Sequence, residues 1–259
     1  MRVTVCQWPD AQGDVERAWE DLVAHACARQ SELIVLPEMP FSAWLAASQG
    51  FDPARWQAAV DSYRAWEERF PEAGAAIVGT RPYTFGNERL SAAFLWEAET
   101  GTRAAHAKSS VDNQEGAWEA VWYAAAPRDF TPALVGGVDV GFLIGMELRE
   151  LGEAIRYAEE GVKLLITPRA TTRAMREDWL KAGIAAASQA CVFALSSNRA
   201  DSSGRYGGDG WIISPRGDVL ARTTVSEPLV TLDLDLTQAQ PVRRNEPTKL
   251  PIMSSTSAT

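Results

Sequence analysis

The stretch VGFLIGMELRELGEAIRYAEEG (residues 140–161) predicts a buried strand, a sharp turn and a helix. Its first five residues are almost all apolar, and leucine, isoleucine and alanine then recur at three- or four-residue steps, as they do along one helix face. Such a turn often displays an enzyme nucleophile, because it lifts one side chain above the sheet edge and helix-start N–H groups face a developing oxyanion. The turn is occupied here by Gly145, which has no nucleophilic side chain.

The composition predicts an acidic globular protein. The chain has 259 residues, 46% of them hydrophobic, and 25 Lys and Arg against 34 Asp and Glu. We expect one domain spanning residues 1–259, with a flexible tail at about residues 250–259. No basic stripe favours nucleic acid, no apolar run has membrane-spanning length, and the N-terminus begins with a strand pattern rather than a charged leader. We therefore expect a soluble cytoplasmic protein without nucleic acid or membrane partners.

The cysteines and histidines do not favour a metal site. Cys6, Cys27 and Cys191 are scattered without a CxxC spacing, which favours reduced core thiols over disulfides or zinc. His25 and His106 are too few for most histidine-based metal sites, and no HExxH is present. We expect no metal and no cofactor. We expect His25 and Cys27 to pack on a helix and His106 to be a strand side chain.

Strand and helix patterns alternate along the whole chain. The alternation occurs twice, which predicts two α-β layers packed sheet against sheet, a four-layer α-β-β-α sandwich of the α/β class. Strands are predicted at residues 2–8, 32–41, 75–83, 91–97, 104–108, 140–144, 162–168, 191–198 and 229–236, a hairpin at 210–222, and helices at 14–30, 53–70, 176–190 and after residue 145.

Three candidate functional positions lie at the ends of predicted strands. Glu38 comes directly after a buried strand, Lys108 opens the polar stretch KSSVDNQEG, and Gly145 lies in the turn. A carboxylate at the end of a buried strand is costly unless it is paired or hydrogen-bonded. Taken alone, Glu38 is equally explained as a solvated loop residue.

This ordered set, together with the segments TPRAT (167–171) and SSNR (196–199), resembles the nitrilase (carbon-nitrogen hydrolase) superfamily over nearly the whole chain. The amidase-like branch of that family is the most similar. The resemblance implies a nitrilase-type α-β-β-α sandwich. It also implies a homodimer or a larger homo-oligomer.

The resemblance further implies a Glu-Lys-Cys triad with a second glutamate. Glu38 matches the general base that takes the thiol proton and later activates water. Lys108 matches the cation that stabilises the tetrahedral oxyanion, and Glu115 matches the second glutamate, which orients substrate or base. A thiol is mostly protonated near neutral pH, so it needs an adjacent base. The backbone N–H of Met146 would be a second oxyanion donor.

Gly145 stands at the cysteine position of this pattern, and Gly161 matches the family's glycine after the helix. Three explanations stay open: an engineered Cys→Gly change that traps substrate, a natural member that lost thiol chemistry and binds a ligand or partner, or a natural member that runs a non-covalent reaction. Retention of Glu38, Lys108 and Glu115 favours a pocket that still does chemistry or binds something polar, because buried charges are costly.

Other side chains near the predicted site have two interpretations each. Glu147 could replace the thiol as nucleophile or base, although a structural role is favoured because this position is acidic in the family. Arg149 and Arg169, near the expected pocket mouth, could bind a carboxylate by bidentate contacts or make ordinary surface pairs. Trp118 and Trp122 either wall the pocket or only pack.

The predicted function is hydrolysis, or a related transformation, of a C–N bond in a small amide, carbamoyl or nitrile substrate. The alternative is a catalytically silent relative that binds a ligand or partner. No GxSxG, Walker loop or GxGxxG motif is present, so serine hydrolase, phosphate and dinucleotide functions have no motif support.

Overall fold

The computed structural model describes residues 1–240 and shows a large mixed sheet. Its strands follow the order β5-β4-β3-β2-β1-β9-β8-β7-β6, while β12 pairs with β1, and β10 pairs with both β9 and β11. The tail predicted at residues 250–259 lies outside the described residues. The strands are β1 (Arg2–Pro9), β2 (Leu33–Val35), β3 (Ala76–Phe85), β4 (Glu88–Glu97), β5 (Gly101–Ala107), β6 (Ala133–Val135), β7 (Val138–Phe142), β8 (Leu164–Arg169), β9 (Phe193–Ala200), β10 (Trp211–Ile213), β11 (Val219–Arg222) and β12 (Leu229–Asp233).

Helix α2 begins where the sequence carries two helix-start signals. The Asp52 side chain accepts hydrogen bonds from the N–H groups of Ala54 and Arg55, and Pro53 takes the first position of α2, so both start signals are present. The main helices of the described chain are α1 (Val15–Arg29), α2 (Pro53–Glu67), α3 (Glu119–Trp122), α4 (Leu151–Glu159) and α5 (Arg176–Ala190).

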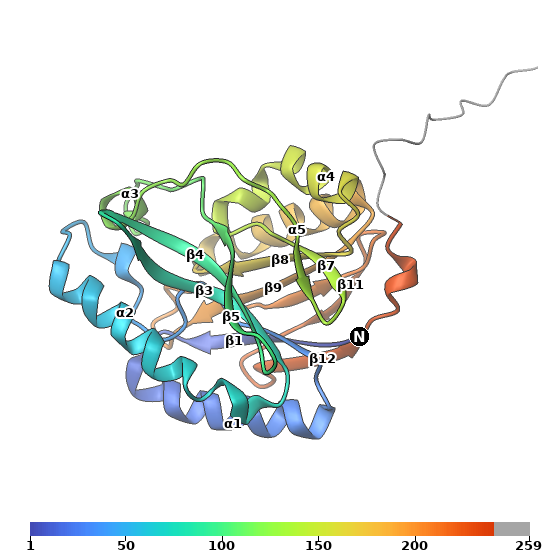
Figure 1. Cartoon of the computed structure of the whole chain (residues 1–259), viewed down its shortest axis with the longest axis horizontal. Helices are drawn as coiled ribbons and strands as arrows, with labels where there is room; N and C mark the ends of the chain where they lie inside the picture. The colour runs from blue at the N-terminus through green and yellow to red at the C-terminus, as the bar shows by residue number, and fades with distance from the viewer. Residues whose placement is uncertain (241–259) are drawn as a thin grey trace, which may run out of the picture.

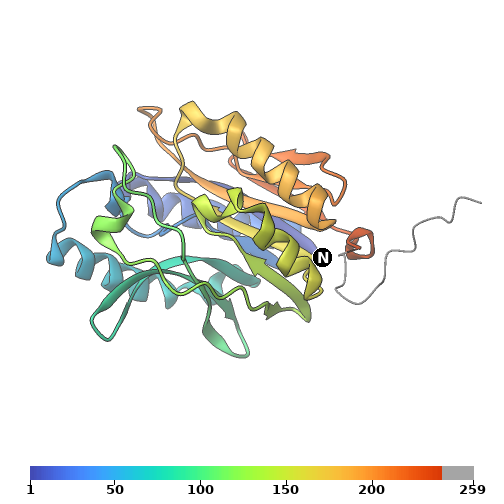
Figure 2. The ribbon, with the colours of Figure 1, turned by 90° about the horizontal axis from the view of Figure 1, so that it is seen from above.

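Alternating side chains on the strands divide the core into layers. Val35 of β2 belongs to an inner cluster together with side chains of β7, β8 and β9. Its neighbour Ile34 points the other way and packs with Trp19 of α1, and Leu165 packs with Tyr157 of α4. Successive side chains of a strand point to opposite faces, so each sheet half is covered by the other half inside and by helices outside. The predicted four-layer α-β-β-α sandwich is confirmed (Figure 1 and Figure 2).

Strand β1 joins the two sheet halves. Residues 3–5 pair in parallel with β2, and residues 7–9 pair in parallel with β9. The strand therefore crosses from one half of the sheet to the other. This crossing brings the segment after β2 close to the ends of β8 and β9.

Two predicted elements are shorter than the sequence pattern suggested. The strand predicted at residues 32–41 ends at Val35, because the backbone then turns away and reaches a left-handed conformation at Met39 (φ 46°). The helix predicted after Gly145 is divided into a 3-10 helix, η4 (Gly145–Arg149), and α4, because the backbone of Glu150 leaves the helical region with ψ 74°. The short elements α3 and β6 were not predicted.

The cysteines are all free, as predicted, but they do not all belong to the core. Cys6 is fully buried, and Cys27 is exposed on α1, so its predicted packing role is wrong. Cys191 is partly buried in a left-handed conformation at the end of α5. Among the described helices, none has both the length and the apolar character needed to cross a membrane.

Candidate active site

Glu38, Lys108 and Gly145 come from three distant parts of the chain and meet in the structure. Glu38 lies in the segment after β2, Lys108 follows β5, and Gly145 opens η4 after β7. The Lys108 ammonium lies 3.1 Å from the nearer Glu38 carboxylate oxygen, and both side chains are buried. A Cβ atom on Gly145 would lie 3.0 Å from Lys108 Nζ and 3.3 Å from Glu38 Oε2. Any side chain at position 145 would therefore point at the Glu38 carboxylate and the Lys108 ammonium.

The second glutamate that contacts Lys108, besides Glu38, is Glu119 and not the predicted Glu115. Lys108 Nζ donates to Glu119 Oε1 at 2.6 Å, and Glu119 Oε2 accepts the N–H of Asp112 at 2.9 Å. Glu119 is buried at the start of α3, whereas Glu115 is exposed in the preceding loop. The second glutamate of the buried cluster is therefore four residues later than the sequence suggested.

A tight turn before α3 explains this difference. Gln114 and Ala117 hydrogen-bond to each other across a chain reversal, which leaves Glu115 on the outside of the loop. The sequence contained a signal for Glu119, because it lies three residues before the fully buried Trp122 and so shares a helix face with it.

Two carboxylates share one ammonium in this buried cluster. Burial raises the pKa of Glu38 to about 7; Lys108 acts to lower this pKa, and the neighbouring Glu119 carboxylate acts to raise it. Burial alone lowers the pKa of Lys108, but the two carboxylates outweigh it and keep the ammonium charged. Ser91 Oγ donates to Glu38 at 2.9 Å, and the Tyr123 hydroxyl lies 3.4 Å from the same oxygen. Glu38 can therefore take up and return a proton near neutral pH.

Glu147 holds the segment around Lys108 against the turn. Its carboxylate accepts the N–H and the hydroxyl of Ser109, both at 2.7 Å, and the N–H of Ile144 at 2.8 Å. It is also hydrogen-bonded to His106 Nε2 at 2.9 Å. Burial raises the pKa of Glu147, but these hydrogen bonds outweigh it and keep the pKa below its ordinary value. The carboxylate is thus fully used by protein partners, which supports the structural role predicted for it.

We expect Glu147→Gln to destabilise the fold by about 1–3 kcal/mol. Both carboxylate oxygens of Glu147 accept hydrogen bonds, whereas the amide has one acceptor oxygen and an NH2 group, so a buried N–H donor would lose its partner. The pKa of Glu147 is held low in the folded chain, so its contribution is present at neutral pH and is lost as pH falls through that pKa. Urea unfolding at pH 7 and at acid pH measures both effects. Glu20→Gln, at an exposed position of α1, is the control, and equal stability of the two variants at pH 7 would contradict the role of Glu147.

The two predicted arginines are placed very differently. Arg149 is exposed, lines the cavity described below, and stacks over the Trp179 ring at 4.9 Å. Arg169 is fully buried, and its guanidinium donates to Ser196 Oγ at 2.6 Å and to the Asp209 carbonyl at 2.6 Å. The prediction that Arg169 lies at the pocket mouth is therefore wrong, since this last residue of β8 still pairs with Asn198 of β9 and its side chain is enclosed.

Neither predicted tryptophan is among the residues that line the cavity. Trp122 is fully buried, and its indole N–H donates to the Ser48 carbonyl at 2.8 Å, so it packs rather than walling the pocket. Trp118 is only partly buried just before α3. The cavity is lined instead by Trp179 of α5, which the sequence analysis did not select.

A cavity of about 360 Å³ opens beside Gly145. Its inner end holds Glu38 and Glu119, and Met146 follows Gly145 along its wall. Within residues 1–240, no group of three His, Cys, Asp or Glu side chains could hold a metal ion. The cavity is lined by Glu38, Asp112, Gln114, Glu115, Gly116, Ala117, Glu119, Gly145, Met146, Arg149, Ala170, Thr171, Thr172, Ala174, Met175 and Trp179.

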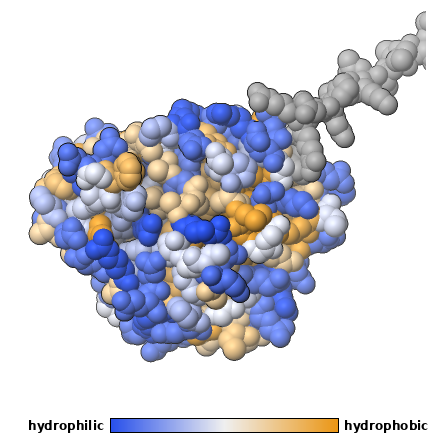
Figure 3. Space-filling view, viewed as in Figure 1, coloured by the Kyte–Doolittle hydropathy of each residue, from blue (hydrophilic) through white to orange (hydrophobic). Residues whose placement is uncertain are grey.

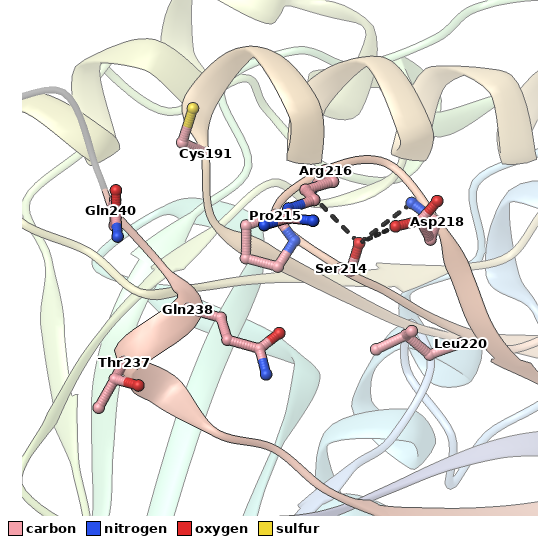
Figure 4. Close-up of a pocket in the computed structure, with 9 residues that line it drawn as sticks. All are labelled: Cys191, Ser214, Pro215, Arg216, Asp218, Leu220, Thr237, Gln238 and Gln240. Atoms are coloured by element: carbon pink, nitrogen blue, oxygen red, sulfur yellow. Dashed lines mark hydrogen bonds between the residues drawn. The ribbon is translucent and has the colours of Figure 1, made fainter.

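A second hollow, of about 650 Å³, lies beside the end of α5 and the β10–β11 turn (Figure 4). Ser214 lines this hollow, but its hydroxyl oxygen accepts the N–H groups of Arg216 and Asp218 and its O–H donates to the Asp218 carboxylate. Cys191 lies at its edge without a base or cation in hydrogen-bond contact. Among residues 1–240, the side chains that line this hollow do not bring a nucleophile, a base and a cation together, and the cavity at Gly145 is the candidate active site.

Comparison with known proteins places this fold in a family. The carbon-nitrogen hydrolase family matches residues 2–244, so the chain belongs to that family. Among solved structures, a carbon-nitrogen hydrolase from Helicobacter pylori G27 is 15% identical, with a TM-score of 0.79 over 92% of this chain and 90% of that one. A mutant of the Nesterenkonia AN1 amidase from the nitrilase superfamily is 18% identical, with a TM-score of 0.75 over 90% and 91%. A search of curated proteins finds no match at the threshold applied.

Proposed function

We propose that this chain hydrolyses the C–N bond of a small amide, carbamoyl or nitrile group held in the cavity beside Gly145, and that Glu38 activates water in place of a thiol. The observation that carries the proposal is the convergence of Glu38 and Lys108 on the direction of a side chain at position 145. In this proposal Gly145 stands where the family has its nucleophilic cysteine. The route through an acyl-enzyme is then closed.

Similar structures support the substrate class. A Nesterenkonia amidase mutant, 18% identical and with a TM-score of 0.75, carries the acetamide moiety of fluoroacetamide added covalently at its active-site cysteine. We extend only the class of ligand, a small amide, to the present cavity. Its volume of about 360 Å³ is enough for such a molecule together with water.

The division of labour in the proposed reaction follows from the contacts. Glu38 takes a proton from water while the water oxygen bonds to the carbonyl carbon, and Lys108 stabilises the negative oxygen that forms. For an amide, Glu38 then returns the proton to the nitrogen, the C–N bond breaks as the C=O bond re-forms, and a carboxylic acid and ammonia leave, or an amine where the amide nitrogen is substituted. Glu119 keeps Lys108 charged, and the N–H of Met146 is proposed as the second donor to the oxyanion. Arg149 and Glu115 are proposed to contact the outer part of the substrate.

We expect Glu38→Gln to reduce the release of ammonia from small amides by at least about a hundredfold, because the general base is removed. In the unchanged chain the rate should rise with pH and reach half its maximum near pH 7, since the pKa of Glu38 is raised to about 7 and only the carboxylate accepts a proton. Glu88→Gln, at the exposed first residue of β4, is the control.

Intact mass spectrometry of the unchanged chain during turnover completes this experiment. No covalent adduct is expected, because Gly145 offers no nucleophile. An adduct would show that another residue attacks the substrate, and full activity of Glu38→Gln would show that the base lies elsewhere.

A silent ligand-binding protein is the second candidate, and the positions of the cysteines favour it. Of the described residues, no cysteine lines the cavity, since Cys6 is in the core, Cys27 is exposed on α1 and Cys191 ends α5. Calorimetric binding of a small amide without any release of ammonia would select this function over hydrolysis.

A homodimer or a larger homo-oligomer, a cytoplasmic location and a single domain stay predictions. An apolar area lies over the end of the sheet where β6 and β7 meet (Figure 3). Leu134 of the edge strand β6 is 51% exposed, and exposed apolar edge strands can pair with another chain. Analytical ultracentrifugation measures the oligomeric state directly.

A further inference from the structure

The backbone that carries Glu38 is held in a conformation that it would not adopt alone. Met39, the next residue, has φ 46°, in the left-handed region that side chains other than glycine rarely occupy. Such a conformation costs about 1–3 kcal/mol and persists only where the surroundings determine it. The Met39 N–H donates to Thr80 Oγ1 at 3.0 Å, and the Glu38 N–H donates to the Arg169 carbonyl at 3.2 Å. These two hydrogen bonds hold the backbone N–H groups of Glu38 and Met39 in place.

One buried arginine, Arg199 of β9, fixes the acceptors of the same segment. Its Nε donates to the Glu38 carbonyl at 2.9 Å, and one Nη donates to the carbonyls of Met39 and of Ser42, the latter at 2.9 Å. Its other Nη pairs with the Asp10 carboxylate at 2.5 Å. The side chain of Arg199 is fully buried.

A guanidinium can bond to all the acceptors around Arg199 at once, and an ammonium cannot. Three carbonyls and one carboxylate surround Arg199 from different directions, and only a planar fork with five N–H donors can reach all of them at fixed angles. Burial lowers the pKa of Arg199, and Asp10 opposes this effect. The Arg199 guanidinium donates to the carbonyls of Glu38, Met39 and Ser42, all in one loop, and leaving these buried groups unpaired would be costly, so its contacts serve to hold that loop.

We propose that Arg199 is a positioning residue for Glu38: it holds residues 38–42 in the strained conformation that aims the Glu38 carboxylate at Lys108 and at position 145. The inference rests on the role proposed for Glu38. Arg199 itself touches no substrate, since it is not among the residues that line the cavity. The chain crossing at β1 makes this contact possible, because it brings the end of β9 beside the segment after β2.

The test is the titration of the Glu38 carboxyl, which needs no turnover. Glutamate side chains are labelled with ¹³C, and the Glu38 signal is assigned by its loss in Glu38→Gln. In Arg199→Lys we expect the pKa of Glu38 to fall by about one unit toward its ordinary range, because the loosened segment lets water reach the carboxyl and burial is the main cause of the raised value.

Arg169→Lys is the matched control. Arg169 is also fully buried and lies on the neighbouring strand β8, but its guanidinium bonds to Ser196, Thr171 and Asp209 rather than to residues 38–42. Its backbone carbonyl accepts the Glu38 N–H, and the substitution keeps that carbonyl. Both variants should lose similar stability, and only Arg199→Lys should move the Glu38 titration. If Arg199→Lys does not fold, Asp10→Asn removes one charge beside Arg199 and should give a smaller shift in the same direction.

Two results would overturn the proposal. The first is an unchanged Glu38 titration in a folded Arg199→Lys or Asp10→Asn variant, and the second is an equal shift in Arg169→Lys. Failure of the hydrolase function gives a different result, since the chain then releases no ammonia while the Glu38 titration still responds to Arg199. In a Gly145→Cys background with turnover, Arg199→Lys should lower kcat by about a hundredfold with KM nearly unchanged, because orientation and not binding is lost.

Discussion

Gly145→Cys is expected to give the chain turnover of small amides at least about a hundredfold above that of the unchanged chain. The new Cβ would point at Glu38 and Lys108, so the thiol would stand beside its base and beside the cation for the oxyanion. Loss of a nucleophile costs other enzymes with covalent intermediates up to about a million-fold in kcat, which leaves wide room for a gain. Ammonia release and an acyl adduct in the intact mass measure the effect.

The backbone sets a cost for this substitution. Gly145 has φ 51°, and a left-handed residue other than glycine loses about 1–2 kcal/mol. The Cβ at 3.0 Å from Lys108 Nζ also requires a small movement, which the flexible end of the lysine can make. Gly145→Ala shares both costs and lacks the sulfur, so it is the matched control. Equal activity of the two variants would show that the cavity cannot use a thiol.

The alternation of strands and helices was predictable because it depends on local hydrophobic periods. Buried runs such as residues 164–166 are wholly apolar and favour a strand, and a sandwich is the arrangement that buries both faces of each sheet half. Glu38 and Lys108 were predictable for a related reason. Glu38 follows the buried strand β2 and Lys108 directly follows β5; both charged side chains are buried, where each needs a partner, and each provides the partner of the other.

Glu119 and Arg199 were harder to identify because their roles depend on turns and crossings. The reversal between Gln114 and Ala117 decides which glutamate returns to Lys108, and no periodic pattern describes the loop at residues 108–118. Arg199 belongs to the SSNR segment that the resemblance used, but its contacts with residues 38–42 exist only because β1 crosses between the sheet halves. Such contacts join residues about 160 positions apart and carry no local signature.

Lys108→Met is expected to destabilise the fold by about 3–5 kcal/mol at neutral pH and to abolish activity. The substitution keeps the length of the side chain but leaves the carboxylates of Glu38 and Glu119 buried without a cation. Removing Lys108 removes the effect that lowers the pKa of Glu38, so this pKa rises further above about 7. Near neutral pH the Glu38 carboxyl of the folded variant is then protonated, whereas the same carboxyl in the unfolded chain is ionised.

The pH dependence of this loss separates charge from packing. A carboxyl whose pKa is raised in the folded state stabilises the fold when protonated, and that stabilisation is lost as pH rises through the folded pKa. Lys108→Met should therefore lose least stability relative to the unchanged chain near pH 5 and most near pH 8, as urea unfolding at both values measures. Lys181→Met, at an exposed position of α5, should change stability by less than about 0.5 kcal/mol at either pH. A loss in Lys108→Met that is equal at both pH values would mean that Lys108 contributes packing, and that the two carboxylates do not depend on its charge.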